Sequence, residues 1–330
     1  MAGNVTFIIG NGFDLSLGLQ TSYRQFFDYV SSKKLHPENR IYKHIATLST
    51  TENWIDFEIE LGNYTKYIEK LPEGDREEES KKFHDDLVEV ADDLASYIEK
   101  EEERVGDAVS QIKFEKDHFY RELPQDIRPR ILPHIDRSQR TTIRLITLNY
   151  TGTLKKLFPD MNVVSVPGNY TVHSILHVHG TLDESMTIGV GDESQLSPAM
   201  SEFGKRYLIK SRSIESTNDG RMDALRNAIN YSDVIVLFGS SIGKTDNHIW
   251  KLVLDWLAAN GNRYLVIHSH AKDYTKTSRR HPVRAGTLVD TTVDKLLEHS
   301  NFNNAVKNSL RSRIFVVPNT QLLFAQAQDN

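Results

Sequence analysis

The sequence contains no cysteine among its 330 residues. Disulfide bonds, thiolate catalysis and zinc sites ligated by cysteine are therefore excluded. No apolar run approaches the ~20 residues that a membrane-spanning helix needs. The chain also lacks an excess of basic residues, since its formal net charge is −5. This charge argues against nucleic acid as the main partner.

The start of the sequence lacks the features of a secretory signal. The apolar run Val5–Ile9 is too short for the core of a signal peptide, and no basic segment precedes it. We therefore expect a cytoplasmic protein without a membrane partner. The apolar and charged fractions are those of a folded globular protein.

Short apolar and β-branched runs recur along the chain, and several of them are followed by glycine, asparagine or histidine. Such continuous runs indicate strands that are buried on both faces, as in a parallel sheet covered by helices. Helical segments lie between many of the runs, so we predict an α/β fold with a doubly wound, mainly parallel, Rossmann-like sheet. The predicted strands are Val5–Ile9, Ile143–Leu148, Val163–Val166, Ile175–Val178, Val234–Phe238, Tyr264–Ile267 and Ile314–Val316.

Three helices of this core have recognisable signals. Ser22 and Gln25 have the spacing of a capping box, which predicts that a helix begins there. Another helix begins near Asp246, which we interpret as its N-cap. The apolar spacing of Leu225 and Ile229 predicts a third helix that leads into the next strand.

The stretch at about residues 36–140 differs from the rest. Apolar residues recur at steps of three and four from Phe83 to Ile98, which predicts an amphipathic helix with a charged outer face. We predict that this stretch is a helical insertion within a single domain of residues 1–330.

A glycine-rich loop follows the first predicted strand. It reads Gly10-Asn11-Gly12-Phe13-Asp14-Leu15-Ser16-Leu17-Gly18. Glycine allows a tight turn and a close approach of the backbone to a ligand, and a following helix N-terminus favours an anion such as pyrophosphate. The spacing differs from that of the ordinary dinucleotide-binding and phosphate-binding loops. A tight turn without a ligand is the alternative.

Polar residues also follow three other predicted strands. Asn149 follows the second, His177-Val178-His179-Gly180 ends another, and Gly239-Ser240-Ser241 follows a fourth. Ligands of open α/β sheets bind beyond the carboxyl ends of the strands, so these motifs predict one common site. His179 could act there as a general base. No third ligand accompanies the two histidines, so we predict no metal site.

These segments together resemble the bacteriophage abortive infection protein AbiH family, from residue 5 to about residue 257. The resemblance implies a role in antiphage defence. It rests on Ile8–Leu15, Gly18-Leu19, Thr21-Ser22-Tyr23, Trp54–Glu58, Thr147–Tyr150, His177–Gly180 and Gly239–Ser241 with Asp246 and His248.

The order of the motifs is also similar, at a distance, to that of sirtuin-like NAD-binding and NAD-hydrolase domains. In those domains the asparagine and the histidine are catalytic, which implies catalytic roles for Asn149 and His179. The absence of cysteine departs from the zinc module of the deacetylases, so we expect no zinc and no deacetylation. Nucleotide binding is expected of Gly10, Asn11, Gly12, Phe13, Asp14, Gly18, Ser22, Tyr23, Gly239, Ser240 and Ser241.

The resemblance implies an abortive-infection effector that hydrolyses NAD, with release of nicotinamide and depletion of NAD in infected cells. NAD or a related nucleotide would be the substrate, with no other cofactor. A phage-derived trigger or partner protein and a homo-oligomer are compatible with this function.

Two other functions remain open. A module that senses a nucleotide without turnover would explain the glycine loops equally well. A nuclease-type toxin would draw on the basic cluster Lys276–His281. Trp54, Asp56 and Glu58 either contact a ribose or lie on a solvated helix face, and the roles of Asp246 and His248 are undecided.

Overall fold

The computed structural model describes residues 3–47, 57–106, 112–113, 123, 125, 127–135, 141–158, 165–166, 170–270, 281–318 and 325–326. The predictions for Trp54, Asp56, the start of the strand at Val163 and most of the basic cluster after Lys276 lie outside the described residues.

A seven-stranded sheet in the order β4-β5-β3-β1-β6-β7-β8 forms the centre of the molecule. The neighbouring strands β5, β3, β1, β6, β7 and β8 run parallel to one another, and the short β4 is antiparallel to β5. The predicted α/β class with a mainly parallel sheet is thus confirmed. The strands are β1 (Asn4–Ile9), β3 (Thr141–Thr147), β4 (Ser165–Val166), β5 (Tyr170–His177), β6 (Val234–Phe238), β7 (Tyr264–Ser269) and β8 (Ile314–Pro318), and β2 (Ile112–Lys113) pairs separately with β9 (Ala325–Gln326).

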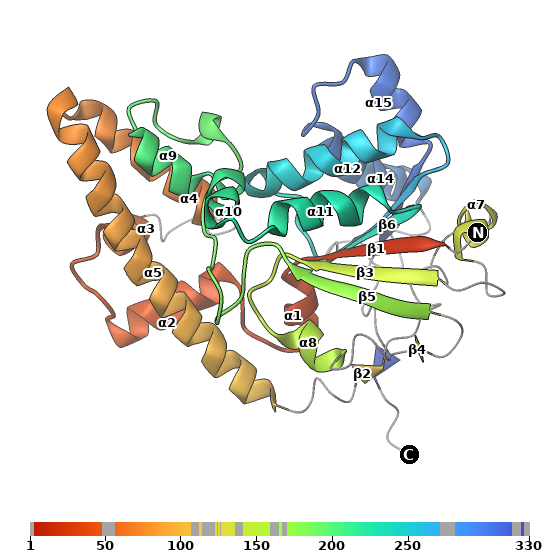
Figure 1. Ribbon diagram of the computed structural model, residues 1–330, viewed down its shortest axis with the longest axis horizontal. Coiled ribbons are helices and arrows are strands. Elements are labelled where there is room, and N and C mark those ends of the chain that lie inside the picture. The colour runs from red at the N-terminus through yellow and green to blue at the C-terminus, as the bar shows by residue number, and fades with distance from the viewer. Residues whose placement is uncertain are drawn as a thin grey trace.

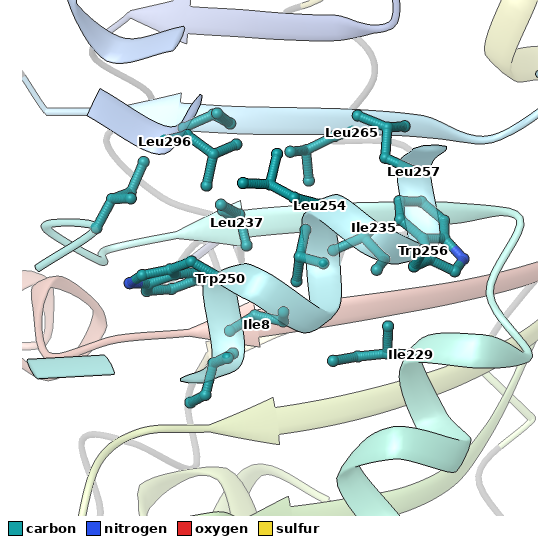
Figure 2. Packing of buried hydrophobic residues seen from close by; sticks show 14 of the residues in the cluster. Ile8, Ile229, Ile235, Leu237, Trp250, Leu254, Trp256, Leu257, Leu265 and Leu296 are labelled. Atoms are coloured by element: carbon teal, nitrogen blue, oxygen red, sulfur yellow. The ribbon is translucent and has the colours of Figure 1, made fainter. Parts of the chain in front are cut away.

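Alternate residues of each strand point to opposite faces of the sheet, so both faces carry apolar side chains. Helices cover both faces. On β1, Ile8 packs against one set of helices, whereas Phe7 and Ile9 belong to the cluster on the other face. Figure 2 shows Trp250 and Trp256 packed over the first face together with Leu237 and Leu265. The helices of the first face are α11 (Arg221–Asn230), α12 (Asn247–Ala259), α14 (Pro282–Leu297) and α15 (Asn304–Arg311), and those of the second include α1 (Gly12–Ser16), α7 (Arg128–Ile131) and α8 (Thr153–Leu157).

A third apolar cluster holds the helices that lie beyond the carboxyl ends of the strands (Figure 1). The predicted amphipathic helix is α5, which runs from Arg76 to Val105. Residues 186–209 pack into the same cluster, although they follow β5 in the chain. The other helices of this group are α2 (Tyr23–Lys33), α3 (Arg40–Thr47), α4 (Phe57–Tyr64) and α9 (Glu202–Leu208), and α10 (Lys210–Thr217) continues from α9.

Local signals decided the start of α2. The hydroxyl of Ser22 accepts from the backbone of Gln25, and the Gln25 side chain accepts in return from the backbone of Ser22. The predicted capping box is confirmed. The predicted helix before β6 is α11, whose Leu225 and Ile229 are buried as expected.

The strand order places β1 at the point where the chain reverses direction across the sheet. From β1 the chain continues to β3 and β5 on one side, and after β5 it crosses to β6, β7 and β8 on the other. In open α/β sheets, ligands bind beyond the carboxyl ends of the strands at such a point. The loops after β1, β3, β5 and β6 therefore form the candidate site.

Candidate functional site at the carboxyl edge of the sheet

The loops after β1 and β6 pack directly against each other. The amide of Gly10 donates to the carbonyl of Phe238 over 2.9 Å, and that of Gly12 donates to the carbonyl of Gly239 over 2.8 Å. A Cβ on Gly12 would lie 2.6 Å from the Gly239 Cα, and Gly239 has a φ of +68°. The close approach that these glycines permit is therefore one between two backbones, and contact with a ligand stays a prediction.

Several other residues of the first motif are engaged within the protein. Asn11 exchanges hydrogen bonds with Thr21, whose hydroxyl donates to the Asn11 amide oxygen over 2.5 Å. Phe13 is buried under the sheet. The Gly18 carbonyl accepts from Arg104, near the end of α5. The helix that follows Gly10 is the short α1. The helix after Gly18, whose N-terminus we expected to bind an anion, is therefore α2, the second helix of the chain.

Asp14 is a fully buried carboxyl group that lies between the segments following β1 and β3. It accepts from the hydroxyls of Thr151 and Thr153 over 2.7 and 2.8 Å. Burial raises the pKa of Asp14 to about 6, although the two threonine hydroxyls act in the opposite direction. The group therefore keeps its proton up to about pH 6, well above the range of an ordinary aspartate, and it ties the loop after β3 to α1.

Asn149 contributes an amide whose orientation is fixed. Its Nδ2 donates to the Gly10 carbonyl oxygen over 3.3 Å. A rotated amide would place its oxygen against that carbonyl, so the contact decides which way the side chain points. The Oδ1 atom of Asn149 is buried and has no hydrogen-bond partner in the part of the chain that the structure describes.

The two histidines of the His-x-His motif both contact the loop after β3. Nδ1 of His177 lies 3.3 Å from the Asn149 carbonyl oxygen, and Nδ1 of His179 lies 3.2 Å from that of Leu148. Burial lowers the pKa of His177. Nε2 of His179 lies 3.2 Å from Oδ1 of Asp246. Both nitrogens of His179 thus face oxygen acceptors.

Asp246 belongs to a buried group of charges that the sequence did not reveal. The ammonium group of Lys210 lies 2.9 Å from Asp246 and 2.7 Å from Glu58, so it bridges the two carboxylates. Burial alone would raise the pKa of Asp246, but Lys210 and His179 lower it well below its usual value. The same carboxylates raise the pKa of Lys210 against the effect of burial. We call Glu58, Lys210, Asp246 and His179 the charge cluster.

The charge cluster corrects our interpretation of Asp246 as a capping residue. Asp246 does occupy the N-cap position of α12, but its side chain makes no capping hydrogen bond. The buried ammonium of Lys210 attracts the carboxylate instead, because charge-assisted contacts are stronger than a bond to a neutral amide. The hydroxyl of Tyr23 lies 3.4 Å from Glu58, and burial raises the pKa of Tyr23 well above its usual value.

His248 lies one residue into α12, and its ring centroid is 6.4 Å from that of His179. Both of its ring nitrogens are buried and lack a hydrogen-bond partner among the residues that the structure describes. Burial lowers the pKa of His248 to about 3. The ring is therefore neutral and offers one donor and one acceptor.

The loop after β6 combines a positive φ at Gly239 with one at Ile242, whose φ is 53°. A β-branched residue rarely adopts this conformation. The Ser240 hydroxyl accepts from the Ile242 amide, and Nε2 of His299 lies 3.3 Å from the Ile242 carbonyl. Ser240 thus supports the turn, whereas Ser241 is exposed at the edge.

The structure brings Gly10, Gly12, Gly239, Asn149 and His179 to one edge of the sheet, and their use as a common ligand site stays a prediction. Among the described residues, no group of three or more His, Asp or Glu side chains is arranged to hold a metal ion. No helix in the described ranges is long and apolar enough to cross a membrane.

Glu58 and Lys210 could not have been identified together, because they lie 152 positions apart. Only the tertiary structure brings Glu58, on α4, next to Lys210, at the start of α10. His248, by contrast, lies close behind the Gly-Ser-Ser motif and belongs to the segments that carry the family resemblance, so the sequence did point to it.

A family model described as bacteriophage abortive infection AbiH matches residues 6–268 of the chain. The matched range begins within β1, ends within β7 and includes every residue of the candidate site. No curated protein matches the chain.

Proposed function

The chain belongs to the bacteriophage abortive infection AbiH family, and we propose that it acts in this defence by binding and hydrolysing NAD. Hydrolysis in infected cells would release nicotinamide and deplete the cofactor that phage replication needs. The proposed site is the carboxyl edge of the sheet, around Asn149 and His179.

The orientation of the Asn149 amide carries this proposal. Its Nδ2 donates to the Gly10 carbonyl, while its acceptor Oδ1 is buried and has no hydrogen-bond partner among the described residues. An unpaired buried acceptor costs about 1–3 kcal/mol, which makes it informative when it occurs at a strand end. A hydroxyl of the NAD ribose or the attacking water would supply the missing donor.

The reaction would consume water and NAD. The bond between the ribose anomeric carbon and the nicotinamide nitrogen breaks, and its electron pair remains on the ring, which becomes neutral. The water oxygen bonds to the anomeric carbon and releases one proton. The transition state resembles the oxocarbenium ion of glycoside hydrolysis, so an ordered ribose and a shielded site favour it.

His179 is the candidate proton acceptor. A proton accepted by His179 would leave an imidazolium, and Asp246, whose Oδ1 lies 3.2 Å from Nε2, would stabilise its positive charge. Lys210 and Glu58 in turn hold Asp246 in place. The order of the motifs, which resembles that of sirtuin-like NAD hydrolases, supports the same pair.

A sensing module that binds a nucleotide without turnover is the second candidate. The observation that favours it is that both nitrogens of His179 face acceptors, so neither is directed toward a water. Purified protein incubated with NAD separates the two functions. Free nicotinamide that accumulates with time supports hydrolysis, whereas saturable binding without nicotinamide release supports sensing.

A further inference from the structure

His248 lies in the first turn of α12, two residues after Asp246 of the charge cluster. Neither of its ring nitrogens has a hydrogen-bond partner in the described part of the chain. Each unpaired buried polar atom destabilises the folded state, and native proteins retain few of them. Folding therefore gives no reason for an imidazole at this position.

The neighbouring ring of His179 shows the contrast. Its Nδ1 lies 3.2 Å from the Leu148 carbonyl oxygen, and its Nε2, which makes no hydrogen bond to the described residues, lies 3.2 Å from Oδ1 of Asp246 as an ion-pair contact. The ring centroids of His179 and Tyr150, and those of His179 and His248, are both 6.4 Å apart. Among the described histidines of this edge, His177 and His179 each place one ring nitrogen near a backbone carbonyl, whereas both ring nitrogens of His248 lack a hydrogen-bond partner.

We propose that His248 binds the ligand of this site through both ring nitrogens. A neutral imidazole that donates at one nitrogen and accepts at the other suits a neutral group with both capacities, which is either a hydroxyl or a carboxamide. An anionic phosphate, which only accepts, would leave the second nitrogen unpaired and would lie against Asp246. The ribose and nicotinamide portion of NAD carries both suitable groups.

This inference rests on the proposed function for the identity of the ligand. It assigns a contact that is separate from the proton transfer of His179 and from the amide of Asn149. Replacing His248 with leucine removes the unpaired nitrogens and keeps most of the buried volume, so a residue kept only for binding should be replaceable without loss of stability.

The matched control is His84 on α5. Its Nε2 is also buried without a hydrogen-bond partner among the described residues, but its ring packs against the exposed aromatic residues Phe203 and Tyr207 of α9. His84→Leu and His248→Leu therefore make the same chemical change at two places, of which only the second adjoins the proposed site.

The test follows the histidine imidazole signals of the full chain by NMR while NAD is added, with His248→Leu for assignment. We expect the His248 signals to shift, the dissociation constant for NAD to rise at least tenfold in His248→Leu, and both thermal midpoints to stay at the wild-type value or above. His84→Leu should bind NAD as the wild type does.

Two results would overturn the inference alone. One is NAD binding or nicotinamide release without any change of the His248 signals. The other is a His248→Leu midpoint several degrees below that of the wild type, which would assign the ring a structural role. If NAD shifts no signal and no nicotinamide is released, the proposed function fails together with this ligand.

Discussion

The side-chain nitrogen of Asn149 lies 3.3 Å from the carbonyl oxygen of Gly10, and this contact joins the loops that follow β3 and β1. The second loop is fixed in turn by the hydrogen bond from Gly12 to Gly239. Contacts at the ends of β1, β3 and β6 thus determine the direction in which the Oδ1 atom of Asn149 points. The arrangement is preorganised by backbone groups, which need no rearrangement when a ligand binds.

Gly12→Ala tests whether the glycines serve the packing of these loops. The new Cβ would lie 2.6 Å from the Gly239 Cα and 2.9 Å from its carbonyl oxygen, and neither backbone can move freely. We expect the free energy of unfolding to fall by about 1–3 kcal/mol, measured with urea. Gly261→Ala, which meets no atom within 4 Å, is the control. Equal stability of the two variants would contradict the packing role.

Asp14→Asn tests the buried carboxyl group. Its pKa in the folded state is about 6, against 3.8 for an ordinary aspartate, so the unfolded state loses the proton first as the pH rises. The wild type should therefore lose about 3 kcal/mol relative to Asp14→Asn between pH 3.8 and pH 6, and nothing further above that range. Unfolding curves of both proteins across this range measure the difference. Parallel pH profiles would mean that Asp14 titrates normally.

Lys210→Met tests the charge cluster. The substitution leaves the carboxylates of Glu58 and Asp246 buried without their cation, so we expect a loss of about 3–5 kcal/mol in the free energy of unfolding. Adding Glu58→Gln to this variant should recover part of the loss, because it removes one of the two unpaired charges. Lys251→Met provides the control, since the Lys251 side chain is 48% exposed. A Lys210→Met variant as stable as Lys251→Met would show that the cluster contributes nothing to the fold.

The sequence predicted the sheet well because its strands are buried on both faces. Continuous apolar runs such as Val234–Phe238 have no competing interpretation when helical segments flank them, and the structure has β6 at those residues. The capping box at Ser22 was equally local, since all of its atoms lie within four residues.

The site could be predicted only where its residues end a strand. Asn149 and His179 follow strands directly, so the topology of a parallel sheet was enough to bring them to one edge. Lys210 lies on α10 and Glu58 on α4, and their pairing depends on tertiary packing that no local pattern encodes. The side chain of Asp246 contacts the ammonium group of Lys210 and does not cap α12, the helix that it precedes.

Nicotinamide release by the wild type, Asn149→Ala and Asn227→Ala is the measurement that tests the central claim most directly. Asn227 is exposed on α11, so its variant controls for the loss of an amide elsewhere. We predict that the wild type and Asn227→Ala release nicotinamide from NAD, and that Asn149→Ala is slower by a factor of about 10² or more at an unchanged thermal midpoint. Equal rates in all three proteins, or no release by any of them, would contradict the account.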